Sequence, residues 1–319
     1  EEQLQQKLQQ YYHIIKTQQT DPVTLYLQGL VLSGRQSIRS QLKVAAAILK
    51  FEGELEQMPW NIIEYQHLST IRNTLQEQKK AANTINLNLS AIKGVMKACF
   101  NLGLISADQL MRLSDIKRVR GKRLPSGRSL TTQEIKKLYR ACTQDSSPAG
   151  KRDYAIIAVM LATGIRRSEV IAINVEDYNT RSGLLNIQSG KGNKQRTAYL
   201  NTETRKIVKQ WLNARYIGKQ EGNGSGSLFN PITKTGSIQS RKLSSHAVYE
   251  IIRHRADQAQ IEKCRPHDLR RTFVTKLLEA GVDINTTRQL AGHTDIQTTA
   301  RYDLRDEKSQ KRAMQQLNR

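Results

Sequence analysis

Six side chains in the second half of the sequence have types that could bind an anion and take part in bond-breaking chemistry. They are Arg166, Lys191, His267, Arg270, His293 and Tyr302. Arginine is suited to clamp an anion, and lysine, histidine and tyrosine are residue types that exchange protons or act as nucleophiles. Each residue alone also fits an ordinary place on the surface or in the core. Six of them in this order are harder to explain that way, so we take them as the candidate catalytic set.

Local patterns predict the elements that hold the first two of these residues. Arg166 comes shortly after residues 153–161, a nearly all-apolar stretch that indicates a buried helix. An arginine at the mouth of such a helix is a poor core residue and a good anion clamp, although surface placement is the commoner position for arginine. Short alternating segments at residues 184–188 and 196–200 predict a β-hairpin with Lys191 at its tip.

The other candidates fall at predicted helix ends. Pro266 is expected to begin a helix that carries His267 and Arg270 as neighbours on one edge. Residues 283–291 predict the next helix, which Gly292 stops directly before the second histidine.

Two capping-box patterns indicate further helix starts. Thr131 with Glu134 predicts one start, and Thr294 with Gln297 predicts a short helix that carries Tyr302.

The first 116 residues are predicted to be helical, because apolar residues recur at helical spacing and no strand pattern competes. The predicted helices cover residues 1–19, 23–32, from 37 onward and 84–101, with a break at Ser33-Gly34. Basic residues lie on one side of two of these helices, and a solvated face or a DNA-contacting face explains them equally well. These residues are Arg35, Arg39 and Lys43 on one helix, and Lys93 and Lys97 on the other.

Charge divides the 319-residue chain. The formal net charge is +23; residues 1–116 hold 12 Lys+Arg against 10 Asp+Glu, and the rest holds 39 against 18. Residues 117–128 have six basic side chains, no acid, two glycines and a proline, which predicts an interdomain linker that lies on phosphates, in preference to a solvated loop. Its candidate DNA contacts are Lys117, Arg118, Arg120, Lys122 and Arg123.

Composition excludes several classes of protein. The most apolar stretch, residues 154–165, has twelve residues and is too short to span a bilayer, which excludes an integral membrane protein. The strong basic charge alone fits either nucleic acid or an anionic membrane surface, and we expect DNA and no membrane as the partner. Cys99, Cys142 and Cys264 are few, odd in number and far apart, which predicts a reduced compartment without a disulfide framework or zinc site. No carboxylate cluster suits Mg²⁺. We therefore expect neither a metal nor a cofactor.

The motifs around these residues resemble those of the tyrosine recombinases, the phage-integrase family that includes the Xer and Cre-type enzymes. The resemblance covers residues 129 to about 305. Residues 20–116 also resemble the family's helical core-binding domain, but Leu87 and Asn88 stand where the family often has basic residues. The matching motifs are Thr163-Gly164-Ile165-Arg166-Arg167-Ser168-Glu169, Gly190-Lys191-Gly192-Asn193-Lys194, His267-Asp268-Leu269-Arg270, Leu290-Ala291-Gly292-His293 and Tyr302.

The resemblance implies a mainly α-helical fold with a small antiparallel β-sheet in the catalytic domain, arranged as a two-domain, C-shaped DNA clamp. A helical core-binding domain with a short N-terminal helix would span residues 1–116. The basic linker would occupy residues 117–128, and the catalytic domain with a C-terminal tail helix residues 129–319.

The resemblance also implies roles. Tyr302 would be the nucleophile that forms a 3′-phosphotyrosyl bond, and Arg166 and Arg270 would clamp the phosphate. Lys191 would protonate the departing 5′ oxygen. His267 would take or position the tyrosine proton, and His293 would donate a hydrogen bond to the phosphate.

The expected function is site-specific recombination of double-stranded DNA through a Holliday junction, in integration, excision or resolution, as in mobile genetic elements. A homotetramer on two DNA sites, linked by the C-terminal helix, and a bacterial-type, cytoplasmic and nucleoid-associated location are expected. Two alternatives stay open. One is a strand-relaxing enzyme like the type IB topoisomerases, and the other is a non-catalytic DNA-binding protein of the same fold.

Overall fold

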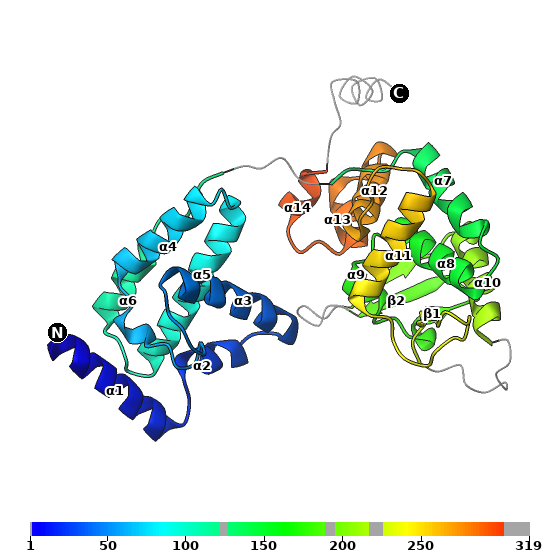
Figure 1. Cartoon of the computed structure of the whole chain (residues 1–319). Coiled ribbons are helices and arrows are strands. Elements are labelled where there is room, and N and C mark those ends of the chain that lie inside the picture. Colours follow the sequence, from blue (N-terminus) through cyan, green and yellow to red (C-terminus); the bar gives the residue numbers. More distant parts are fainter. Residues whose placement is uncertain (1, 122–126, 189–194, 217–225, 303–319) are drawn as a thin grey trace, which may run out of the picture. The chain divides into compact units, whose positions relative to one another are not determined.

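The computed structural model describes residues 2–121, 127–188, 195–216 and 226–302. It divides the chain into two compact units, Glu1–Pro125 and Ser126–Arg319 (Figure 1). Each unit has its own hydrophobic core. The predicted domain boundaries around residues 117–128 remain a proposal.

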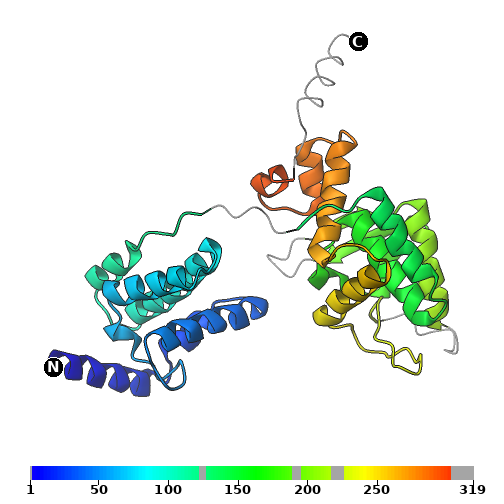
Figure 2. The ribbon, with the colours of Figure 1, turned by 45° about the horizontal axis from the view of Figure 1, so that its top comes forward.

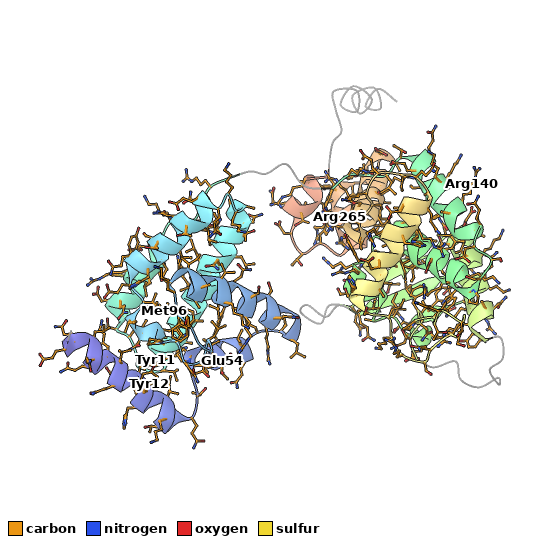
Figure 3. All side chains as sticks on the ribbon, viewed as in Figure 1. Tyr11, Tyr12, Glu54, Met96, Arg140 and Arg265 are labelled. Carbon is orange, nitrogen blue, oxygen red and sulfur yellow. The ribbon has the colours of Figure 1, made fainter. Side chains whose placement is uncertain are left out.

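The first unit is helical throughout its described residues. Helix α5 lies at its centre and packs against α2, α3, α4 and α6, and Met96 of α5 is completely buried (Figure 3). Tyr11 attaches the first helix to this core, because its ring is buried and its hydroxyl donates to the Met58 carbonyl at 2.6 Å. The helices are α1 (Glu2–Gln18), α2 (Pro22–Gln28), α3 (Leu32–Ile48), α4 (Tyr65–Glu77), α5 (Ala82–Asn101) and α6 (Ala107–Ser114), with a 3-10 turn at Trp60–Ile62.

One helix end in this unit differs from the prediction. The carboxylate of Asp21 accepts the amides of Val23 and Thr24, each at 2.9 Å, as expected of an N-cap. However, α2 ends at Gln28, and the predicted break at Ser33-Gly34 is wrong because both residues lie in the first turn of α3. The first-turn amides have no intrahelical partner, so residues that weaken a helix interior are tolerated there.

The second unit is built around α8 (Pro148–Thr163), which packs against helices α7, α10, α11 and α12. Residues 155–160 are fully buried, which confirms the predicted apolar helix. In the part of the chain that the structure describes, no helix is long and apolar enough to cross a membrane. The other helices are α7 (Thr132–Thr143), α9 (Arg167–Val170), α10 (Thr202–Tyr216), α11 (Ser245–Gln258), α12 (Pro266–Glu279), α13 (Ile284–Ala291) and α14 (Ile296–Ala300), with a 3-10 turn at Val175–Asp177.

A small antiparallel sheet completes this unit. Its strands are β1 (Tyr178–Asn179), β2 (Leu184–Gln188) and β3 (Gln195–Tyr199), in the order β1-β2-β3. The buried Leu185 and Ala198 face each other across the central pair. The predicted hairpin is therefore present, although its second strand begins one residue earlier and β1 was not predicted. The tip of the hairpin, with Lys191, lies outside the described residues.

Helix caps set the positions of the last three helices, which lie next to one another in Figures 1 and 2. Gly292 ends α13 as predicted, with a left-handed backbone, and Asp283, predicted as the first helical residue, is instead its N-cap. The capping box predicted at Thr294 is wrong by one residue. Asp295 caps α14 instead, by accepting the amide of Gln297 at 3.0 Å.

Candidate active site

The second unit holds all the described members of the predicted catalytic set. Arg166 is the N-cap residue of α9, and His267 and Arg270 lie in the first turns of α12. His293 directly follows the end of α13, and Tyr302 follows α14. Lys191, the sixth member, lies outside the described residues.

The tyrosine contacts both histidines. The Tyr302 hydroxyl is 3.0 Å from Nε2 of His267, within hydrogen-bonding distance. The ring of His293 lies nearly parallel to the tyrosine ring, at 18° and 6.0 Å between centroids. Only 9% of Tyr302 is exposed. The arrangement places a phenol oxygen beside a proton acceptor in a sheltered position.

Both histidines are held in their neutral form. Burial, followed by the positive charge of Arg270, lowers the pKa of His267. Burial and the charges of Arg270 and Arg166 lower the pKa of His293 to about 4. Neutral imidazoles at pH 7 can each accept a proton at one ring nitrogen and donate one at the other.

Arg270 is a buried cation with a donor to spare. It is 3% exposed, and its Nη1 donates to the Gly164 carbonyl at 2.6 Å. Its Nη2 is buried and has no hydrogen-bond partner. Burial and the charges of Arg166 and Arg196 lower the pKa of this guanidinium to about 10, so it is still protonated at neutral pH. An unpartnered buried donor on a cation fits a binding position for an anion.

Arg166 is fixed at two of its nitrogens. Its Nη1 donates to Glu169 and its Nη2 to the Gly292 carbonyl, both at 2.9 Å. A guanidinium has five N–H donors, so three remain for another ligand. The side chain is 42% exposed, which leaves it accessible.

Two residues that were not in the predicted set organise this cluster. Glu169 is 5% exposed and accepts hydrogen bonds from Arg166 and from both terminal nitrogens of Arg196, at 3.2 and 3.0 Å. Burial opposes ionisation of Glu169, but the hydrogen bonds and charge of Arg196, joined by those of Arg166, lower its pKa. Two guanidinium groups therefore bind one carboxylate, and with the nearby charge of Arg270 the cluster keeps a net positive charge.

The glycine that ends α13 has no space for a side chain. A Cβ on Gly292 would lie 2.9–3.0 Å from atoms of the Arg196 side chain. The backbone there is left-handed, with φ of +66°, which also favours glycine. Glycine at this position therefore leaves space for Arg196 to reach Glu169, and the Gly292 carbonyl accepts the hydrogen bond from Arg166.

The candidate DNA contacts of the first unit differ in their surroundings. Arg35 donates to the carbonyls of Leu30 and Gln28, and Arg39 pairs with Glu56 at 2.5 Å. Lys93 donates to the carbonyls of Ser114 and Ile116 at 2.7 and 3.3 Å, at the end of α6. These three side chains have partners within the protein. Lys43 and Lys97 are exposed.

The start of the predicted linker is bound to the first unit. Nδ2 of Asn86 donates to the Val119 carbonyl at 3.0 Å, and the Val119 amide donates back to Oδ1 at 2.9 Å. Val119 is half-buried, whereas Lys117, Arg118 and Arg120 are exposed. These two hydrogen bonds hold the basic residues on the outside. Lys122 and Arg123 lie outside the described residues.

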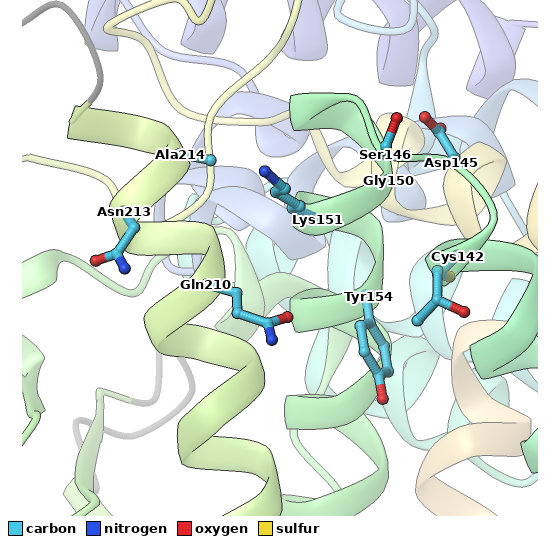
Figure 4. A pocket seen from close by; sticks show the side chains of 10 residues that line it. Cys142, Asp145, Ser146, Gly150, Lys151, Tyr154, Gln210, Asn213 and Ala214 are labelled. Carbon is cyan, nitrogen blue, oxygen red and sulfur yellow. The ribbon is translucent and has the colours of Figure 1, made fainter.

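A pocket of about 500 Å³ lies elsewhere in the second unit, between α10 and the α7–α8 corner (Figure 4). Lys151, Tyr154 and Gln210 are among the residues that line it. No member of the predicted catalytic set does so. Within the described ranges, no three His, Cys, Asp or Glu side chains are close enough to hold a metal ion.

Known proteins resemble this chain over most of its length. The signature of the phage integrase family matches residues 128–308. Tyrosine recombinase XerD of Pseudomonas aeruginosa is 31% identical over 277 residues, which cover 86% of this chain and 87% of the relative. Tyrosine recombinase XerC of Alcanivorax borkumensis is 29% identical over 249 residues, which cover 78% and 77%.

Solved structures share the fold at low sequence identity. The integrase of transposon Tn1549, in complex with transposon right end DNA, has a TM-score of 0.65 at 16% identity and covers 94% of this chain and 100% of that chain. A lambda integrase dimer bound to a COC′ core site has a TM-score of 0.62 at 17% identity and covers 87% and 92%.

The fold and the family signature together define the class: this chain belongs to the phage integrase family. It is a tyrosine recombinase that cleaves and rejoins DNA, and its similarity to the Xer recombinases extends over most of the chain. The predictions of family, of a mainly helical fold with a small antiparallel sheet, and of a DNA-recombining enzyme are confirmed. The relatives named above are recombinases and integrases, which favours this function over the topoisomerase alternative.

Proposed function

We propose that Tyr302 attacks a DNA phosphate and that strand exchange proceeds through a 3′-phosphotyrosyl intermediate and a Holliday junction. The observation that carries this proposal is the 3.0 Å contact between the Tyr302 hydroxyl and Nε2 of the neutral His267. The unpartnered donor of Arg270, on the same first turns of α12, supplies a place for the phosphate.

The proposed cleavage step exchanges one phosphorus–oxygen bond for another. The Tyr302 oxygen bonds to phosphorus, the bond to the 5′ oxygen breaks, and the phenol proton passes to His267. Lys191 gives a proton to the departing 5′ oxygen. The tyrosine ester preserves the energy of the phosphodiester, so rejoining by a new 5′ hydroxyl needs neither ATP nor a metal ion.

The remaining groups stabilise charge on the phosphate. Arg166 and Arg270 donate to the non-bridging oxygens, where negative charge develops in the transition state. Nδ1 of His293 lies 2.8 Å from the buried Thr299 hydroxyl. With that hydroxyl as the donor, the imidazole proton lies on Nε2, from which it can be donated to the phosphate.

A suicide substrate tests this function. A duplex nicked just beyond the candidate cleavage position loses its short 5′-hydroxyl product, so that the covalent protein–DNA intermediate accumulates. Candidate sites from DNA that flanks the gene supply the sequences. An adduct that maps to one phosphate is the expected result. It would also exclude the non-catalytic alternative, whereas relaxation of supercoiled DNA by monomers without sequence preference would support a topoisomerase.

The proposed general acid gives a prediction for Lys191. Lys191→Ala should slow cleavage of an ordinary substrate by about a hundredfold or more, because the 5′ oxygen leaves poorly without a proton. A 5′-thio substrate should restore most of the rate, since a thiolate leaves without protonation. The comparison uses single-turnover adduct formation on both substrates. Equal defects on the oxygen and sulfur substrates would contradict the general-acid role.

The exposed basic residues predict a steep dependence of binding on salt. Removal of one basic side chain that binds a phosphate should flatten the slope of log affinity against log salt by about one. Changing Lys117, Arg118 and Arg120 together to Gln should therefore flatten it by about two to three and weaken binding to all sequences alike. Anisotropy titrations of a labelled duplex at several salt concentrations measure this.

A matched variant controls for net charge. Lys7, Lys16 and Lys80 are also exposed in the first unit, outside the linker and the candidate contacts. Changing these three to Gln removes the same charge and should alter the slope less. Equal slopes for the two triple variants would show that the linker start does not lie on phosphates.

We also propose double-stranded DNA and further copies of this chain as partners. The lambda and Tn1549 integrases above were solved on DNA, the former as a dimer. The sequence of the tail, with Ala313, Met314 and Leu317 as a narrow apolar stripe, supports a helix that docks on a neighbouring protomer of a tetramer. This tail lies outside the described residues. The proposed site of action is the cytoplasm, where bacterial DNA lies.

A further inference from the structure

Arg271 connects the proposed nucleophile with the chain that arrives from the linker. It follows Arg270 on α12 and was not in the predicted catalytic set. Its Nη1 donates to the Gly127 carbonyl at 2.7 Å. Its guanidinium carbon lies over the ring of Tyr302, 5.4 Å from the ring centroid. One side chain therefore contacts both the tyrosine and the end of the predicted linker.

The acceptor of this hydrogen bond is itself held in place. The buried carboxylate of Asp268 accepts the Arg128 amide at 3.2 Å through Oδ1, and the Arg265 amide at 2.8 Å through Oδ2. Gly127 has a φ of +123°, and a Cβ on it would lie 2.6 Å from Oδ1 of that carboxylate. The backbone of residues 127 and 128 is thus attached to the first turn of α12. Its carbonyl is a fixed anchor for the Arg271 side chain.

The ring of Tyr302 packs in a small apolar cluster with Val274, Leu278 and Ala291, whereas its hydroxyl is held at one point. The tyrosine lies just beyond α14, which has only five residues, and among the described residues its hydroxyl has a single hydrogen-bond partner, His267. A cation over the face of an aromatic ring attracts it electrostatically and favours one ring orientation. The anchored Arg271 therefore restricts where the Tyr302 ring lies and where its hydroxyl points.

We propose that Arg271 is a positioning residue for the nucleophile, with the end of the interdomain linker as its anchor. This inference rests on the proposed role of Tyr302. It assigns Arg271 to the tyrosine and not to the DNA phosphate. A misplaced nucleophile reacts slowly even when the phosphate is bound normally, since rate depends steeply on the attack geometry.

Two reactions at the same DNA position distinguish an Arg271 that positions the tyrosine from an Arg271 that binds the phosphate. Adduct formation on the suicide substrate needs Tyr302. Joining of a strand that ends in a 3′-p-nitrophenyl phosphate does not, because a 5′ hydroxyl of the second strand bonds directly to phosphorus. The bond to p-nitrophenolate breaks, and the hydroxyl proton passes to the solvent. Tyr302→Phe is the control for both reactions: it should retain joining and form no adduct.

Arg271→Leu should slow adduct formation by at least about tenfold and change the joining rate by less than about threefold. Arg271→Lys keeps the positive charge and should recover part of the adduct rate. Lys276→Gln removes a charge from an exposed position on the same helix and should match the parent in both reactions.

The joining rate also reports whether the variant is folded. Equal losses in both reactions would place Arg271 on the phosphate, or in the general stability of the site, and would overturn the inference. Adduct formation at the parental rate by Arg271→Leu would overturn it as well. Absence of any adduct from the parent chain on a duplex where it still performs the joining reaction would instead refute the proposed role of Tyr302, and the inference with it.

Discussion

Tyr302→Phe is expected to bind target DNA as tightly as the parent chain and to form no covalent adduct. Only the hydroxyl is removed, so the contacts of the ring with His293 and Arg271 remain while the attacking oxygen is absent. Denaturing gels of a suicide substrate measure the adduct, and anisotropy titrations measure the affinity.

Two further variants make this result specific. Tyr199 and Tyr12 are large exposed tyrosines outside the site, and their Phe variants should form adduct at the parental rate. Proteolysis of the parental adduct should leave the DNA attached to a peptide that contains Tyr302. An adduct formed by Tyr302→Phe would remove this residue from its proposed role.

Arg270→Ala should slow cleavage by at least about a hundredfold, which corresponds to roughly 2.7 kcal/mol of transition-state stabilisation. The affinity for DNA should fall much less, because one buried donor contributes little beside many surface phosphate contacts. Arg270→Lys keeps a charge but cannot both bond the Gly164 carbonyl and present a second, fixed donor, so we expect only partial recovery.

The matched control is Arg167→Ala. Arg167 is exposed and follows Arg166 in the sequence, so the variant loses the same charge near the site without losing a buried donor. It should cleave at nearly the parental rate. Circular dichroism of both variants tests whether the fold is retained. Equal cleavage by Arg270→Ala and the parent chain would refute the proposed phosphate clamp.

Local signals in the sequence predicted much of the fold near the site. The capping box of Thr131 with Glu134 and the helix end at Gly292 are both present, because each depends on residues within one helical turn. The short strand β1 and helices α4, α6, α10 and α11 were not predicted. Two of them, α4 and α10, do have buried apolar residues at helical spacing, such as Leu68, Ile71 and Leu75 of α4, which could have indicated them, and they pack against α5 and α8.

Long-range partners account for what the sequence could not predict in the site. The spacing of Glu169, three residues after Arg166, matches a capping box and could have indicated this carboxylate. No local pattern links it to Arg196, which is 27 residues away and reaches it from β3. Lys93 illustrates the same limit, because its spacing fitted a solvated or a DNA-contacting face and gave no sign that its ammonium group bonds two carbonyls more than twenty residues away.

The unpartnered donor of Arg270 has a consequence for the stability of the free enzyme. A buried cation beside two other arginines, with one carboxylate between them, is repelled by its neighbours and deprived of water, and both effects oppose folding. An oxyanion bound at Nη2 of Arg270 would reduce the repulsion between the arginines and replace the lost water as a hydrogen-bond partner. By mass action, it would also stabilise the folded state. Without DNA, the free energy of unfolding of the enzyme is therefore lower than it would be with an oxyanion bound at Arg270. On the proposed function, the DNA phosphate is that oxyanion, so binding of DNA should raise the free energy of unfolding of the catalytic unit.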